Sequence, residues 1–224
     1  MSYRKTVFAT NEIYHTYNRG VEKRPIFITR KDYSRFMDLI NYYRFANCPI
    51  KFSRLKTLSV KEREKIFSEL DKNSKKLVDI LAYCLMPNHV HFLLKQLADG
   101  GISKFMAKVA SGFSHYFNKR HERVGHLFQG NFGAVRVGND EQFLHVSRYI
   151  HLNPVSAFLI KTNDLNKYSY SSFPEYMGLA KGFCNTKEIL SFFKKPEEYR
   201  KFVCDYSDFK QQFRQIDHLT LEEE

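Results

Sequence analysis

The feature that most constrains the fold is a pair of apolar segments separated by only two residues. VDILAYCLM (Val78–Met86) and HVHFLLK (His89–Lys95) are rich in β-branched, aromatic and leucine side chains. The dipeptide Pro87-Asn88 between them is typical of a tight turn. The sequence therefore predicts a β-hairpin in the middle of the chain.

Before the hairpin, the pattern predicts one strand and one helix. Glu12–Asn18 is aromatic and β-branched, as expected for a strand. Thr29 and Asp32 have the spacing of a capping box, and the apolar residues that follow recur at helical spacing. This part of the chain therefore supplies a strand followed by an amphipathic helix.

After the hairpin, the pattern predicts a helix, a strand and a second helix. We expect Ser103 to cap the first of these helices, and Asn131–Val137 to form the strand. Asp140 opens the second helix, which Pro154 should interrupt or end.

This order of elements predicts an α+β fold, namely a ferredoxin-like βαββαβ antiparallel sheet. The helix after the last strand would then come to the open face or the edge of the sheet. We expect one domain over residues 1–178, with a polar surface insertion at about 51–76 that contains a short helix at Ser59–Leu70. Residues 179–224 would form a helical C-terminal extension, frayed at its end.

The charge balance favours a polyanionic partner. Thirty-six Lys and Arg against 24 Asp and Glu give a net charge of +12, among 14 Tyr and 21 Phe that could stack on bases. Four scattered cysteines without a CxxC pair argue against a zinc ribbon. Without a signal core or an apolar run of membrane-spanning length, we expect a cytoplasmic, nucleoid-associated protein and no membrane partner.

His89 and His91 form the first candidate for chemistry. Residues two apart on a strand point to the same face, so both imidazoles could reach one ion while Val90 packs into the core. The alternative is a pair of strand histidines that are simply exposed or hydrogen-bonded. A histidine-triad nucleotide hydrolase is excluded, because the position of its third histidine is Leu93.

Tyr149 and Asn153 form the second candidate. They lie four residues apart, and hence on one face of a helix. Taken alone, Tyr149 could be a core aromatic residue and Asn153 a helix boundary. Together with the histidine pair they suggest a site in which two imidazoles and an amide oxygen hold Mg²⁺ or Mn²⁺. The Tyr149 phenol would then attack a polarised phosphate.

At this point the sequence resembles a known family. YCLMPNHVHFLL resembles the signature hairpin of the HUH endonucleases, and RYIHLNPVSAFLI resembles the tyrosine helix of single-tyrosine transposases, most closely the REP-associated ones. The segments YHTYNRGVEKRPIF, NKRHERVGHLFQGNF and YSYSSFPEYMG agree with it. The resemblance covers about residues 10–178, and its motifs occur together and in order.

The resemblance implies a metal-dependent transposase that cleaves and rejoins single-stranded DNA, often near a hairpin. Carried over by position, Tyr149 is the nucleophile that forms a 5′-phosphotyrosine and frees a 3′-OH. His89 and His91 are the metal ligands, and Asn153 is the third. Members of the family act as monomers or as homodimers.

Four further residues are candidates for contacts with DNA. Arg19, Arg136 and Arg148 could bind phosphate, and His145 could contact phosphate or assist the Tyr149 phenol, one turn away. His15 on the first strand could also lie near the site.

The chain departs from the family where positive charge is usual. Asn131 stands where an arginine is common, Gly133 where a lysine is frequent, and Ser156-Ala157-Phe158 where Arg-Ala-Gly is common. These losses bear on DNA contacts and leave the tyrosine, histidine and asparagine set intact.

Two other functions remain open on the sequence. One is a domesticated protein that binds hairpin DNA without cutting it. The other is a metal-dependent hydrolase of small phosphates, which would leave Tyr149, Asn153 and the basic charge unused. The transposase hypothesis requires Tyr149 to lie within about 10 Å of the histidine pair.

Overall fold

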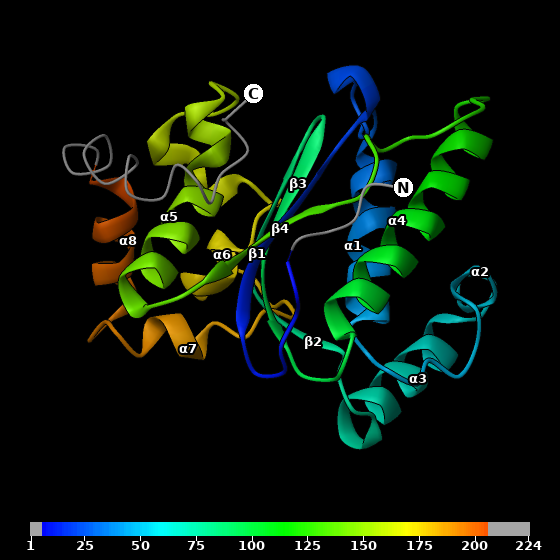
Figure 1. Cartoon of the computed structure of the whole chain (residues 1–224), viewed down its shortest axis with the longest axis horizontal. Coiled ribbons are helices and arrows are strands. Elements are labelled where there is room, and N and C mark those ends of the chain that lie inside the picture. The colour runs from blue at the N-terminus through cyan, green and yellow to red at the C-terminus, as the bar shows by residue number, and fades with distance from the viewer. Residues whose placement is uncertain (1–5, 206–224) are drawn as a thin grey trace.

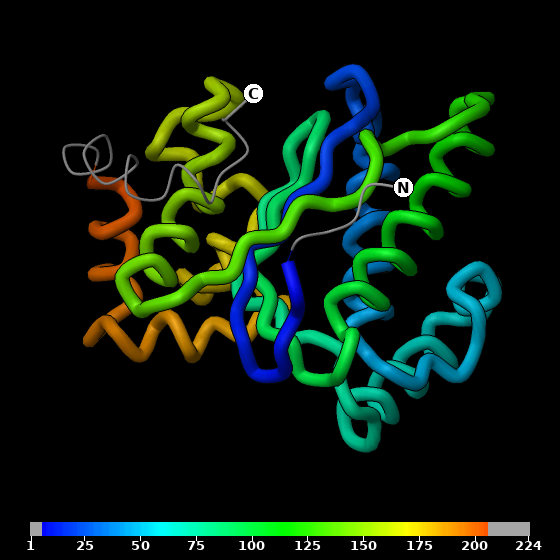
Figure 2. Tube along the Cα trace, in the orientation of Figure 1, coloured from blue at the N-terminus to red at the C-terminus, as the bar shows by residue number. Residues whose placement is uncertain are grey.

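A four-stranded antiparallel sheet forms the centre of the structure, a computed structural model that describes residues 6–205 (Figure 1). Its strands are β1 (Ile13–Arg19), β2 (Val78–Met86), β3 (His89–Gln96) and β4 (Gly133–Val137). They lie in the order β2-β3-β1-β4, so the first strand is inserted between two later ones. Figure 2 shows the traces of β3, β1 and β4 running side by side.

The register between β1 and β3 fixes which residues can meet across the sheet. Tyr17 lies opposite His91, and Arg19 lies opposite His89. On its other edge β1 pairs with β4, where Tyr17 lies opposite Gly133. Because side chains alternate between faces, the odd-numbered residues of β1, β3 and β4 share one face of the sheet.

One face of the sheet is covered by two long helices, α1 (Arg30–Tyr43) and α4 (Gly101–Arg120), as Figure 1 shows. The apolar stripe of α1 packs with that of α4 and with the even-numbered residues of β3. The buried core on this side includes Phe36, Leu39, Ile40, Val90, Phe92, Phe105, Val109 and Phe113. Val90 therefore packs into the core, as the alternation predicts.

The other face is covered by α5 (Asp140–Ser156) and by the chain that follows it (Figure 1). That chain forms η2 (Thr162–Lys167), α6 (Phe173–Tyr176), α7 (Lys187–Leu190) and α8 (Pro196–Cys204). Its core includes Leu93, Val146, Tyr149, Ile150, Leu152, Phe173, Tyr176, Tyr199 and Val203. The βαββαβ order, the antiparallel sheet and the helix on its open face confirm the ferredoxin-like fold expected from the sequence.

Two expected helix boundaries are wrong. The helix assigned to a Ser103 cap begins at Gly101, after Gly100 in a left-handed conformation (φ 62°). Pro154 does not end α5, which continues to Ser156. A proline in the last turn removes only one intrahelical hydrogen bond, and the Pro154 carbonyl still accepts hydrogen bonds from the backbone of Leu159 and Ile160. The last strand also begins two residues later than expected.

Residues 51–76 contribute more to the core than their composition suggests. They form α2 (Phe52–Leu55) and α3 (Val60–Asn73), the second in place of the short helix expected at Ser59–Leu70 and with a capping box at Ser59 that was not predicted from the sequence. Phe52, Leu55 and Leu70 are nonetheless buried in the α1/α4 core. These buried apolar side chains hold residues 51–76 against the domain, so the segment is not only a surface insertion.

The C-terminal segment is described as far as Asp205, so the expected frayed end lies outside the described residues. His151 of α5 is fully buried, and its two ring nitrogens hydrogen-bond to the hydroxyls of Tyr199 and Ser172, each at 2.7 Å. These contacts attach α8 and the start of α6 to α5. No helix of the described residues has the length and apolarity needed to cross a membrane.

Asp32 joins the start of α1 to the end of α4. Its buried carboxylate accepts hydrogen bonds from the backbone N–H groups of Ile28 and Thr29 at 3.1 and 2.7 Å. It also contacts Tyr116 Oη and His121 Nε2 of the α4 end. Burial alone would raise the pKa of Asp32, but the hydrogen bonds from Thr29, His121 and Ile28 hold it below its ordinary value.

We therefore expect Asp32→Asn to lower the free energy of unfolding by about 1–3 kcal/mol at neutral pH. The pKa is lower in the folded than in the unfolded state, so this stabilisation is present above the unfolded pKa and is lost as the pH falls. Thermal unfolding at several pH values would measure it. As a control, Asp99→Asn at an exposed position should leave the free energy of unfolding almost unchanged. The expectation would be contradicted if the difference in stability between Asp32→Asn and wild type stayed constant as the pH falls into the acid range.

Candidate active site

His89 and His91 lie on the face of β3 that α5 covers. Their ring centroids are 4.8 Å apart, with the rings perpendicular. His91 is fully buried and His89 partly so. Burial lowers the pKa of His89 to about 4 and that of His91 well below its usual value, the first helped by the charge of Arg19. Both imidazoles are therefore neutral at physiological pH, the form that can ligate a metal.

His15 on β1 orients His91. Its Nε2 lies 3.0 Å from His91 Nδ1, and the two rings are stacked with centroids 5.2 Å apart. The other ring nitrogen of His91, Nε2, is buried and has no hydrogen-bond partner among the described residues. A ligating histidine commonly uses its second nitrogen for such an orienting bond. The geometry leaves His91 Nε2 available to an additional ligand.

Asn153 and Tyr149 are brought to the histidines by α5. The Asn153 side chain hydrogen-bonds to His89 and raises its pKa against the effect of burial. Its Nδ2 also donates to the Tyr149 backbone carbonyl at 3.0 Å. His89 Nδ1 is held in turn by Asn88 Oδ1 at 2.6 Å. The helical spacing of four residues thus places an amide beside the histidine pair, as the sequence suggested.

The Tyr149 ring packs edge-on against two of the histidines. Its centroid lies 5.4 Å from that of His91 and 5.8 Å from that of His15. The side chain is only 4% exposed. The distance condition set by the transposase hypothesis is therefore met.

A second phenol lies beside the same histidines and was not singled out by the sequence. The Tyr17 ring centroid is 6.4 Å from that of His91 and 5.4 Å from that of His15. It occupies space over Gly133, where an added Cβ would lie 2.2 Å from Tyr17 Cε2. The signal for both His15 and Tyr17 is their alternation on β1, which becomes informative once β1 is known to pair with β3.

The donor set fits a small divalent ion. Among the described residues, no cluster of three or more His, Cys, Asp or Glu side chains is placed to hold a metal. The residues that meet here are instead two neutral histidines and one amide, with a buried imidazole nitrogen of His91 that lacks a partner. Mixed imidazole and oxygen ligation is compatible with Mg²⁺ or Mn²⁺.

The four residues expected to contact DNA fall into two groups. Arg19 is partly exposed beside His89, and Arg136 is exposed on β4, paired with Glu12 at 2.8 Å. Arg148 is 1% exposed and lies over the Phe202 ring, and His145 is 8% exposed with its ring 5.5 Å from the same ring. Both side chains thus lie against α8 and away from solvent, and their contact with DNA stays a prediction.

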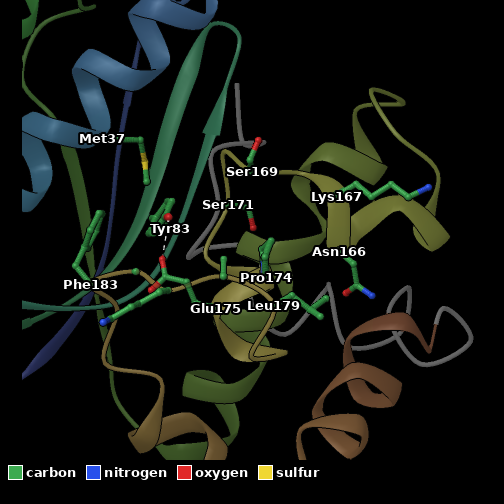
Figure 3. A pocket seen from close by; sticks show the side chains of 13 residues that line it. Met37, Tyr83, Asn166, Lys167, Ser169, Ser171, Pro174, Glu175, Leu179 and Phe183 are labelled. Atoms are coloured by element: carbon green, nitrogen blue, oxygen red, sulfur yellow. Dashed lines mark hydrogen bonds between the residues drawn. The ribbon is translucent and has the colours of Figure 1, made fainter.

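A separate cavity of about 370 Å³ lies at the β2 edge, between α1 and the chain after α6 (Figure 3). Within it Tyr83 Oη donates to Glu175 Oε1 at 3.0 Å, and the Cys184 backbone N–H donates to Glu175 Oε2 at 2.9 Å. Burial raises the pKa of Glu175. Its lining includes no residue of the histidine and tyrosine set, and the Glu175 bonds attach the C-terminal chain to β2.

Comparison with known proteins agrees with this fold. The family model described as "Transposase IS200 like" matches residues 41–153, just over half of the chain, from α1 to Asn153. No curated protein is similar enough in sequence to match. The chain is a transposase: it belongs to the IS200-like transposase family.

Two solved structures are similar to different degrees. The structure of a REP-associated tyrosine transposase bound to a REP hairpin shares 17% identity, with a TM-score of 0.54, over 81% of this chain and 89% of that one. This match shows a common fold. A tRNA(His) guanylyltransferase from Saccharomyces cerevisiae covers 98% of this chain and 83% of its own at 15% identity, but its TM-score of 0.32 is too low to support an argument.

The close approach of Tyr17 to Gly133 gives a test of the site's packing. We expect Gly133→Ala to destabilise the fold by about 1–3 kcal/mol, because the new Cβ must displace the Tyr17 ring. Gly138→Ala is the matched control, since its Cβ would meet nothing closer than Gln142 Oε1 at 3.5 Å. When Tyr17 is replaced by alanine, the loss of stability caused by Gly133→Ala should largely disappear, as measured by thermal unfolding. An equal loss of stability with and without the Tyr17 ring would show that the ring is not what the new Cβ meets.

Proposed function

We propose that this transposase cleaves and rejoins single-stranded DNA with Tyr149 as the nucleophile. The observation that carries the proposal is the packing of the Tyr149 ring against His91, whose buried Nε2 is unpartnered. A phenol next to a potential metal ligand is what attack on a metal-polarised phosphate requires. If these residues served only to pack the core, no hydrogen bond would offset the cost of removing His91 Nε2 from water.

The chemistry conserves the energy of the broken bond. The Tyr149 oxygen forms a bond to phosphorus while the bond from phosphorus to the 3′ oxygen breaks. The phenol loses its proton and the leaving oxygen gains one, which gives a 5′-phosphotyrosine and a free 3′-OH. Attack by a 3′-OH on the phosphotyrosine reverses these steps, so the strand can be rejoined without ATP.

His89, His91 and Asn153 would hold the divalent ion, Mg²⁺ or Mn²⁺. The ion supplies Lewis-acid stabilisation of charge at the phosphate. His15 keeps the His91 ring in the orientation that presents Nε2. Asn88 and the Tyr149 carbonyl restrain His89 and Asn153 in the same way, so most of the site is organised before DNA arrives.

The substrate that we propose is single-stranded DNA next to a hairpin. The net charge of +12 favours a nucleic acid, and the structural relative was solved with a REP hairpin. Arg19 beside His89 is the candidate contact for the phosphate. Arg136 is an even-numbered residue of β4, so it projects from the opposite face of the sheet, where it pairs with Glu12, and we do not include it in this contact. The protein would act as a monomer or a homodimer.

We also propose residues 1–178 as the HUH domain, with residues 179–224 as an extension that supports it. Tyr199 and Val203 of the extension pack in the same core as α5. Their role would be to hold α5, and with it Tyr149, against the sheet.

The identity of the nucleophile can be tested against the second phenol. With a hairpin carrying single-stranded flanks and Mn²⁺, we expect wild type and Tyr17→Phe to form a covalent protein–DNA adduct on a denaturing gel. Tyr149→Phe should form none, because it lacks the attacking oxygen. An adduct that requires Tyr17 would reassign the nucleophile. Hairpin binding with no adduct in any variant would favour the domesticated binding protein.

The metal ligands can be tested without DNA. By titration calorimetry with MnCl₂ we expect His91→Ala and Asn153→Ala each to weaken binding by at least about tenfold. The exposed His126→Ala is the matched control and should bind as wild type does. Equal binding by the two site variants and wild type would exclude this site for the ion.

A further inference from the structure

The end of α5 carries an aromatic side chain where the backbone favours glycine. The Phe158 N–H donates to the Val155 carbonyl and the Leu159 N–H donates to the Pro154 carbonyl, both at 2.9 Å. This is the pattern of a Schellman C-cap. Phe158 takes the left-handed position of that motif, with φ 56°, which glycine occupies at the least steric cost.

Packing does not account for the phenylalanine. Its side chain is 96% exposed, the highest value among the large hydrophobic residues of residues 6–205. The two residues before it are exposed as well, and Leu159 is 45% exposed. A strained, solvated aromatic side chain therefore weakens the fold slightly and adds nothing to the core.

The position of Phe158 connects it to the candidate active site. It follows Asn153 by five residues, a rise of roughly 7.5 Å along a helix axis. The chain directly after it lines a shallow hollow of about 390 Å³, formed by Leu159, Ile160, Lys161, Asp164, Lys167 and Tyr168. Tyr168 Oη donates to the Leu85 carbonyl at 2.8 Å, and Leu85 pairs with Val90, next to His89. The hollow thus adjoins the histidine end of the sheet.

The hollow has the character of a nucleotide site. Leu159, Ile160 and the Tyr168 ring supply apolar surface. Lys161 and Lys167 supply two positive charges against the one negative charge of Asp164, which pairs with Lys167 at 2.8 Å. Aromatic surface beside lysines is how proteins bind single strands without reading their sequence.

We propose that Phe158 is a stacking platform for an unpaired base that flanks the cleaved phosphodiester, with the adjoining backbone phosphate at Lys161. The inference rests on the proposed function, since it places the base next to the phosphate that Tyr149 attacks. The left-handed backbone fixes the direction of the Cα–Cβ bond, and the side chain projects into solvent, where a base can reach its face. Phe158 is therefore a positioning residue and not a catalytic one.

The test is binding of a fluorescein-labelled DNA hairpin with a single-stranded flank, measured by anisotropy, with the same hairpin without a flank as reference. Phe158→Gly should weaken binding of the flanked hairpin by about 5- to 150-fold, the range expected for one stacked base. It should leave the flankless hairpin unaffected and raise the melting temperature. Phe158→Trp should restore binding. The control Phe192→Ala removes a half-exposed phenylalanine at the opposite end of the sheet and should not matter.

The outcomes separate this inference from the proposed function. If wild type forms the Tyr149 adduct but Phe158→Gly binds the flanked hairpin equally well, only the stacking role is overturned. If binding of the flanked hairpin depends on Phe158 but no adduct forms, the stacking role is supported and the proposed cleavage activity is rejected. If Phe158→Gly instead converts a dimer to a monomer in sedimentation, Phe158 serves a second copy of the chain, and the inference is overturned.

Discussion

The pairing of β1 with β3 is the constraint on which the rest of the site depends. It sets His15 and Tyr17 beside His91, and Arg19 beside His89, from segments at least 70 residues apart in the sequence. Without that pairing the two histidines of β3 would remain a strand pattern of uncertain meaning. With it, His91 gains an orienting partner on one nitrogen, and the other points into the site. The helices α1 and α4 matter to the chemistry mainly because they hold the opposite face of this sheet.

The second requirement is the rotation of α5 about its axis. Tyr149 and Asn153 must face the sheet. On another side of α5, the two buried ring nitrogens of His151 hydrogen-bond to the hydroxyls of Tyr199 and Ser172. A rotation of α5 would break these bonds inside the core, where unpaired polar groups are costly. The C-terminal chain therefore has a structural role in presenting the tyrosine, although as far as Asp205 it adds no residue to the histidine and tyrosine set.

What could be predicted from the sequence was local. Alternation on β3, helical spacing on α5 and the capping box at Thr29 depend on neighbours within a few residues, and the structure has them as expected. What could not be predicted depends on contacts between distant segments. Examples are the His15–His91 bond and the burial of Arg148 under Phe202. The roles of Tyr149, His89, His91 and Asn153 remain predictions, which the geometry allows and chemistry must test.

The contact of Tyr17 with Gly133 has a consequence for how such a chain can change over time. A side chain at position 133 and a ring at position 17 compete for one volume, so each residue restricts which substitutions the other tolerates. A chain that acquires a lysine at position 133 must first shorten or reorient residue 17, because the reverse order passes through a less stable intermediate. The two positions should therefore vary as a pair.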